Sequence, residues 1–349
     1  MPVARRSFRA LLVAAGLVAT ACGGSPKPPP TPLPNPLAAR PCDAPSTPRP
    51  APSPPAAPGG PANATIARLS KGAQPLTLLS TDVPVTPGRQ TFGFDITTSE
   101  GGLLTAGNPT VWLAKNPHAK AVGPFVAQWF PFTAYPECHD RSPLSPIPGV
   151  YSATIDVPST GAWFVAVVTS TSGHQAVAVG DPGSTPPGGL TATDGPVPAQ
   201  LGSRATSVKT PVATTERGLR EIDTRIPPSP LHYISLDQAL RNGKPTVVVF
   251  STPLLCQTRL CGPVTDEVLL AYQQIGKARA NFIHVEEFLP GPDLKPPPPT
   301  LENQSPAFKA WGLHTEPWVV VIDKHGIIRG RFDGPVTAPQ IEAALLPLL

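Results

Sequence analysis

The stretch that decides the fold is Lys244-Pro-Thr-Val-Val-Val-Phe250-Ser-Thr-Pro-Leu-Leu-Cys256-Gln-Thr-Arg-Leu-Cys261-Gly-Pro263. Its apolar run from Val247 to Phe250 predicts a buried strand, because the run is too short for a helix and rich in β-branched residues. Two cysteines, Cys256 and Cys261, follow at the point where the strand gives way to a helix. Backbone N–H groups at a helix N-terminus stabilise negative charge, so a cysteine placed there forms its thiolate more readily. The stretch therefore indicates a redox-active cysteine pair.

The residues after the cysteines predict a regular succession of short elements. In chain order these are a helix from 263, a strand over 281–287, a short helix over 305–312, strands over 318–323 and 327–332, and a capped helix over 337–349. A short helix over 235–243 precedes the first strand, with Ser235 as its N-cap. Strands that alternate with helices indicate an α/β sheet.

This last third of the chain resembles the thioredoxin fold in the order of its elements and in Pro317, which stands where that family has a cis-proline. The resemblance implies that Cys256 is the more exposed, attacking thiolate and that Cys261 resolves the mixed disulfide. It also implies that Pro317 presents the backbone beside Glu316 to an extended substrate strand. A carboxylate such as Glu316 disfavours a thiolate next to it. The implied partners are extracytoplasmic protein thiols and disulfides, with no cofactor and no metal.

Three features depart from the thioredoxin pattern. Four residues separate the cysteines instead of two, Leu255 replaces the usual aromatic residue, and Val249 stands where the family has a buried carboxylate. The Cys-x-x-x-x-Cys-Gly motif is similar to the peroxidatic and resolving pair of bacterioferritin-comigratory-type peroxiredoxins, which makes a thiol peroxidase the first alternative. A non-catalytic binding or assembly module with stapled cysteines is the second. A copper chaperone similar to the Sco type is the third.

The spacing of the cysteines sets a geometric condition. If both lay in one regular helix, their Cα atoms would be roughly 8–9 Å apart, beyond the disulfide range of about 4.4–6.8 Å. Either Cys256 lies in the turn ahead of the helix, or oxidation unwinds the first helical turn.

Residues 1–22 predict a lipoprotein signal peptide. Three arginines among the first nine residues precede twelve apolar or small residues, which are too few to span a bilayer. The segment Ala19-Thr-Ala-Cys22 resembles a bacterial lipobox, whose cysteine is lipidated and becomes the mature N-terminus. We therefore expect a protein held at the extracytoplasmic face of a bacterial cell membrane through lipid on Cys22.

Composition and cysteine count add two expectations. Residues 23–61 are dominated by Pro, Ala and Ser, which predicts a disordered tether. With Cys22 lipidated, an even number of the five cysteines remains, which favours a structural disulfide between Cys42 and Cys138. The formal net charge of +4 is carried by scattered Lys and Arg residues and does not indicate nucleic-acid binding.

Residues 62–180 predict an immunoglobulin-like β-sandwich. Six segments of strand-like composition are separated by turn residues, at 64–69, 90–96, 110–114, 149–156, 162–168 and 175–179. The segment Pro148–Trp163 is similar to the Gly-x-Tyr…Gly-x-Trp strand pair of bacterial extracytoplasmic sandwiches such as the YtkA- or FixH-like domains. Residues 181–230 are rich in Gly, Pro, Thr and Ser, and predict a second linker.

The predicted fold class is multidomain: an all-β immunoglobulin-like sandwich followed by an α/β thioredoxin-like domain over 231–349, with disordered proline-rich linkers. The predicted function is extracytoplasmic, membrane-anchored thiol–disulfide exchange through the Cys-x-x-x-x-Cys pair.

Overall fold

The structure is a computed structural model that describes residues 61, 63–81, 83–105, 107–134, 147–180, 189–256, 260–290 and 300–349. The predicted signal peptide with Cys22, the predicted tether, and Cys42 and Cys138 all lie outside these residues. Over the part of the chain that is described, no helix combines the length and the apolar character needed to cross a membrane.

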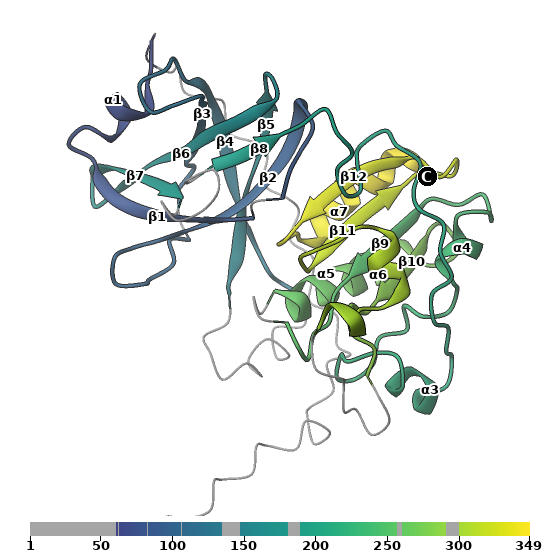
Figure 1. Cartoon of the computed structure of the whole chain (residues 1–349). Coiled ribbons are helices and arrows are strands. Elements are labelled where there is room, and N and C mark those ends of the chain that lie inside the picture. The colour runs from purple at the N-terminus through teal and green to yellow at the C-terminus, as the bar shows by residue number, and fades with distance from the viewer. Residues whose placement is uncertain are drawn as a thin grey trace, which may run out of the picture. The chain divides into compact units, whose positions relative to one another are not determined.

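The N-terminal strands form a closed barrel (Figure 1). Strand β3 pairs with β4 on one side and with β6 on the other, so seven strands close in the order β3-β4-β5-β2-β1-β7-β6. A short strand, β8, attaches to β6. The strands are β1 (Gln74–Ser80), β2 (Gly88–Thr97), β3 (Thr110–Ala114), β4 (Val122–Pro131), β5 (Gly149–Val157), β6 (Gly161–Thr171), β7 (His174–Gly180) and β8 (Gly189–Ala192). Closure removes free sheet edges from the ring.

The predicted fold class, an immunoglobulin-like sandwich followed by an α/β thioredoxin-like domain, was wrong. The chain is mostly β: its N-terminal strands close into a seven-stranded barrel, and the described residues contain six α-helices, of which only α5 exceeds eight residues. The sequence does not predict β1 and β4, because both contain proline, which signals a turn or a sheet edge. These two strands supply pairings that complete the ring, since β1 joins β2 to β7 and β4 joins β3 to β5.

Residues 64–69, predicted as a strand, belong instead to helix α1 (Ile66–Ser70) and the residues before it. Thr65 caps this helix, because its Oγ1 accepts the N–H of Arg68 at 3.2 Å. Ile66 and Leu69 lie three residues apart, face the same side of the helix and are buried. The N-cap and the helical spacing of the two buried apolar residues favour a helix here, although the composition of the segment is typical of a strand.

The C-terminal part of the chain contains a four-stranded sheet in the order β10-β9-β11-β12 (Figure 1). Strands β9 and β10 are parallel, whereas β11 is antiparallel to both β9 and β12. The strands are β9 (Thr246–Phe250), β10 (Asn281–Val285), β11 (Trp318–Ile322) and β12 (Ile328–Asp333). Every residue of β9, β10 and β11 is buried. Burial on both faces explains the uninterrupted apolar runs Val247–Phe250 in β9 and Trp318–Ile322 in β11.

Helices cover both faces of this sheet. Val247 and Val249 of β9 belong to a core that includes residues of α5 (Cys261–Ile275) and α7 (Ala338–Leu345). Val248 and Phe250 point to the other face, where the core includes residues of α4 (Leu236–Ala239) and α6 (Pro306–Ala310). Two 3₁₀ turns, η3 (Leu301–Asn303) and η4 (Leu346–Leu348), complete the described elements of this part. Strand β9 is therefore the central element that carries the cysteine stretch.

The segment 181–230, predicted as a disordered linker, is built into the fold from residue 189 onward. Ala199 and Ala205 belong to the core around α4 and α6, and Arg204 forms a β-bridge with Ile327. Helix α3 (Glu216–Arg220) follows, and after it Asp223 is only 1% exposed. The Gly- and Pro-rich segment is therefore irregular in backbone conformation but packed into the fold. It places the carboxylate of Asp223 in the protein interior.

Candidate functional site

Cys256 and Cys261 form a disulfide at the end of β9, with their Cα atoms 5.9 Å apart. Cys261 is the first residue of α5, whereas Cys256 lies in the turn ahead of this helix. The first of the two geometric alternatives therefore holds. Cys261 is fully buried and Cys256 is partly exposed, so Cys256 is the more accessible residue of the pair.

The start of α5 supplies a hydrogen bond to the disulfide. The backbone N–H of Cys261 donates to Sγ of Cys256 over 3.2 Å. The first N–H groups of a helix have no partner within the helix and carry its positive partial charge. A thiolate released at Cys256 would therefore be stabilised by this N–H group.

Pro317 and Glu316 lie against the disulfide. The peptide bond between them is cis, and Pro317 is buried directly before β11. A carboxyl oxygen of Glu316 and the sulfur atoms of Cys256 and Cys261 all lie within 4.8 Å of one another. The structure thus brings together the two cysteines and the proline that the sequence predicts as site residues, and it adds the side chain of Glu316.

The environment of Glu316 favours its protonated form. Burial, and then the neighbouring charge of Glu287, raise the pKa of Glu316 to about 8, although hydrogen bonds from Thr252 act in the opposite direction. Its Oε2 atom is buried and has no hydrogen-bond partner among the described residues. A buried carboxylate oxygen without a donor is costly when charged. At neutral pH this carboxyl group therefore holds a proton beside the disulfide.

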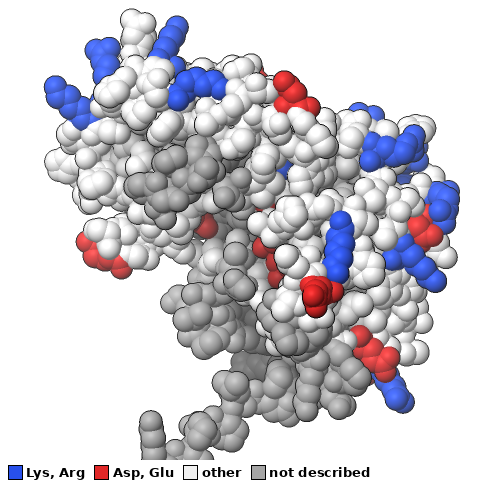
Figure 2. All heavy atoms as spheres, viewed as in Figure 1, with Lys and Arg blue, Asp and Glu red and all other residues white. Residues whose placement is uncertain are grey.

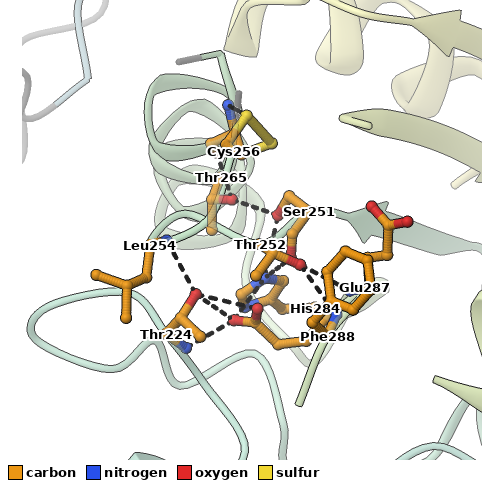
Figure 3. The surroundings of a disulfide bond; sticks show 11 residues. Thr224, Ser251, Thr252, Leu254, Cys256, Thr265, His284, Glu287 and Phe288 are labelled. Carbon is orange, nitrogen blue, oxygen red and sulfur yellow. Dashed lines mark hydrogen bonds and ion pairs between the residues drawn. A yellow bond between two sulfur atoms is a disulfide. The ribbon is translucent and has the colours of Figure 1, made fainter. Parts of the chain in front are cut away.

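A chain of hydrogen bonds runs from the first residue of α5 into the protein interior (Figure 3). Thr265 Oγ1 donates to the carbonyl oxygen of Cys261 at 2.7 Å and lies 2.6 Å from Ser251 Oγ. Ser251 Oγ lies 3.0 Å from Nε2 of His284 on β10. The disulfide helix is in this way tied to a buried histidine on the neighbouring strand.

His284 belongs to a buried cluster of four ionisable groups, with Asp223, His232 and Glu286. Burial alone would lower the pKa of His284, but the Asp223 carboxylate, whose Oδ2 lies 3.4 Å from Nδ1, raises it to about 9. Burial opposes the charge of Asp223, yet the two histidines hold its pKa well below the usual value. Burial raises the pKa of Glu286 well above its usual value and lowers the pKa of His232. These shifts favour a charged Asp223–His284 pair, the protonated form of Glu286 and the neutral form of His232.

Two groups of side chains have the spacing of metal ligands. Asp223, His232 and His284 lie close enough, but Oδ2 of Asp223 already accepts the N–H and the hydroxyl of Ser229 at 2.6 and 2.8 Å. This arrangement fits a hydrogen-bonded ion pair better than a metal centre. In the second group, Cys256, Cys261 and Glu316, the sulfurs are joined as a disulfide, whereas metals bind thiolates.

The buried cluster was not predicted from the sequence. Val249, which stands where the thioredoxin pattern has a carboxylate, is fully buried. The residue paired with it on β10 is His284, so the ionisable side chain lies on the neighbouring strand instead. His284 lies within β10 and Glu286 directly after it. A spacing of two in an extended segment places both side chains on one face, and this is the signal that the sequence offers. Asp223 lies in the predicted linker, and no local pattern connects it with β10.

The chain was compared with models of known protein families and with curated protein sequences, and it matches none of them. The chemistry of the site is therefore inferred from its residues and their geometry.

Proposed function

We propose that the chain is an extracytoplasmic, membrane-anchored thiol–disulfide oxidoreductase that uses the Cys256–Cys261 pair. One observation carries this proposal: a partly exposed sulfur is disulfide-bonded to a buried sulfur at the first residue of a helix, beside a cis-proline. The more exposed sulfur of such a pair is the one a substrate thiolate reaches, and the buried one is the leaving group. Cys256 is thus the exchanging cysteine and Cys261 the resolving cysteine.

The thioredoxin resemblance supports the proposed reaction. Around the cysteines, the elements follow one another as strand, helix, strand, helix, strand, strand and helix, and Pro317 precedes the third strand. By this resemblance the partners are protein thiols and disulfides outside the cytoplasm. The membrane anchor is proposed from the lipobox-like sequence that ends at Cys22.

The decisive experiment equilibrates the protein with glutathione buffers and reads the Cys256–Cys261 state by mass spectrometry. The soluble chain from residue 23 onward is suitable, because residues 189–230 pack with the C-terminal sheet and cannot be left out. Working oxidoreductases have potentials between roughly −120 and −270 mV, and we expect a value in this range. A reduction potential below about −300 mV would identify a purely structural disulfide and reject the proposal.

Single cysteine variants test the assigned roles. Cys261→Ser should accumulate a mixed disulfide between Cys256 and a substrate peptide, because the resolving thiol is missing. Cys256→Ser should abolish exchange. Exchange at the parental rate by Cys256→Ser would show that the assignment is wrong.

A further inference from the structure

The Glu316 carboxyl group is placed to exchange protons with the disulfide sulfurs. Its oxygen lies within 4.8 Å of both sulfur atoms, and it belongs to the residue before Pro317, on a different element from the cysteines. Its Oε2 has no hydrogen-bond partner among the described residues, so this atom is open to a proton-transfer partner. Strand β9, which leads into the cysteines, consists of Thr, three Val and Phe and offers no carboxyl group.

We propose that Glu316 is the acid and base of the cysteine pair, giving a proton to the sulfur that leaves and taking it back when the disulfide re-forms. The inference rests on the proposed thiol–disulfide exchange and assigns the proton transfer that this reaction needs. It also makes the exchange rate dependent on pH in the mildly alkaline range.

The bond changes balance as follows for a substrate with two thiols. A substrate thiolate attacks Sγ of Cys256, an intermolecular S–S bond forms, and the Cys256–Cys261 bond breaks. Its electron pair goes to Sγ of Cys261, and the proton of Glu316 moves to this sulfur. The second substrate thiolate then attacks the substrate sulfur of the mixed disulfide, and Cys256 leaves as a thiolate. The substrate is oxidised by two electrons and the cysteine pair is reduced by two. Glu316 is left as a carboxylate, which takes the proton of Cys261 back when the disulfide re-forms.

The groups that face Glu316 explain why it holds a proton. The Glu287 carboxyl, after β10, repels a negative charge on Glu316, while the charge of His284 acts in the opposite direction. Thr252, after β9, hydrogen-bonds the Glu316 carboxyl. Its Oγ1 also accepts the N–H groups of Glu287 and Phe288 (Figure 3). Burial dominates these influences and raises the pKa of Glu316 to about 8. An acid whose pKa lies near the working pH is best suited to proton transfer.

The test measures the rate at which dithiothreitol reduces the Cys256–Cys261 disulfide between about pH 6 and about pH 10, divided by the concentration of dithiothreitol thiolate. In the parent protein, this rate constant should be flat below pH 8 and fall above it, as Glu316 loses its proton. Glu316→Gln should lower the plateau by about 100-fold, at the low end for general acid catalysis, and remove the fall. Glu302→Gln changes an exposed carboxyl on η3 and should reproduce the parental profile.

The outcomes separate this proposal from the proposed function. If the parent disulfide reacts no faster than a short unstructured peptide disulfide, both are overturned. If the parent reacts rapidly and Glu316→Gln keeps its rate and its fall, thiol–disulfide exchange stands and the role of Glu316 is rejected. Circular dichroism establishes that each variant is folded. If Glu316→Gln does not fold, Glu316→Asp is measured instead. Its shorter side chain moves the carboxyl group away from the sulfurs, which must change the rate constant below pH 8 or the pH at which it falls. A pH profile equal to that of the parent would reject the proposal.

Discussion

Replacing His284 by glutamine should change how the stability of the protein depends on pH. His284 is fully buried, and burial alone would lower its pKa, but the Asp223 carboxylate raises the pKa from 6.5 to about 9. A group whose pKa is higher in the folded than in the unfolded state binds its proton more tightly when folded. Its contribution to stability is therefore complete below pH 6.5 and is lost as the pH rises through about 9.

The size of this contribution follows from the shift. At about 1.4 kcal/mol per pKa unit, a rise from 6.5 to about 9 corresponds to about 3 kcal/mol. Glutamine carries no charge at any pH and cannot contribute this amount. Near pH 6 the parent should be more stable than His284→Gln by about 3 kcal/mol, and the difference should largely disappear near pH 10.

Urea unfolding at a series of pH values, followed by circular dichroism under non-reducing conditions, measures the difference. Hydrogen exchange of the β9 and β10 amides gives a local readout beside the global one. The matched control is His314→Gln, which alters an exposed histidine after α6 and should run parallel to the parent. A gap between parent and His284→Gln that stays constant from pH 6 to pH 10 would refute a charged His284 in the folded state.

Three further predictions concern stability and are checked by urea or thermal unfolding. Glu267→Gln should lower the free energy of unfolding by about 2–4 kcal/mol. The carboxylate accepts three backbone N–H groups at 2.7, 2.9 and 2.7 Å, and an amide cannot accept all three. A loss below about 1 kcal/mol would contradict this reasoning. Arg225→Ala should lower the free energy of unfolding by about 3–5 kcal/mol, because it leaves the buried carboxylate of Asp266, 2.6 Å away, without its ion-pair partner. Arg241→Ala removes a more exposed ion pair with Asp237 and should leave the stability almost unchanged. Equal effects of the two substitutions would contradict this reasoning. Gly149→Ala should lower the melting temperature, because the added Cβ would clash with the backbone oxygen of Phe130. Gly262→Ala on α5 meets no atom within 4 Å and should raise the stability by about 0.5–1 kcal/mol. The opposite order of the two melting temperatures would refute this reasoning.

The C-terminal strands and the cysteine site follow from the sequence because their signals are local. Val247–Phe250 is buried on both faces and is therefore apolar without interruption, which marks it as a strand. The cysteines lie directly after this strand, and Pro317 directly before another, so their proximity follows once the two strands are paired. The relation of Glu316 to the sulfurs follows from the same register.

The barrel and the buried cluster depend on contacts that no local pattern encodes. Strand β3 pairs with β6 more than fifty residues later, and this single pairing turns an open sheet into a ring. Proline in β1 and β4 conceals two of the strands that the ring needs. Asp223 reaches His284 from a segment whose composition predicts a linker. The composition of such a segment predicts that it has no regular helix or strand. Whether it is buried depends on the residues of the core that pack against it.

The two proton-holding groups near the disulfide differ in what they control. A buried ion pair is a poor source of stability compared with apolar packing, so the Asp223–His284 pair is better explained by the position it fixes. Through Ser251 and Thr265, His284 is linked to the carbonyl oxygen of Cys261, which belongs to the backbone of the cysteine helix. Glu316 in contrast lies beside the sulfurs and loses its proton at a lower pH than His284. The exchange rate should therefore respond to Glu316, and the stability between about pH 6.5 and about pH 9 should respond to His284. A fall in rate that vanishes in His284→Gln but persists in Glu316→Gln would reverse this division of roles.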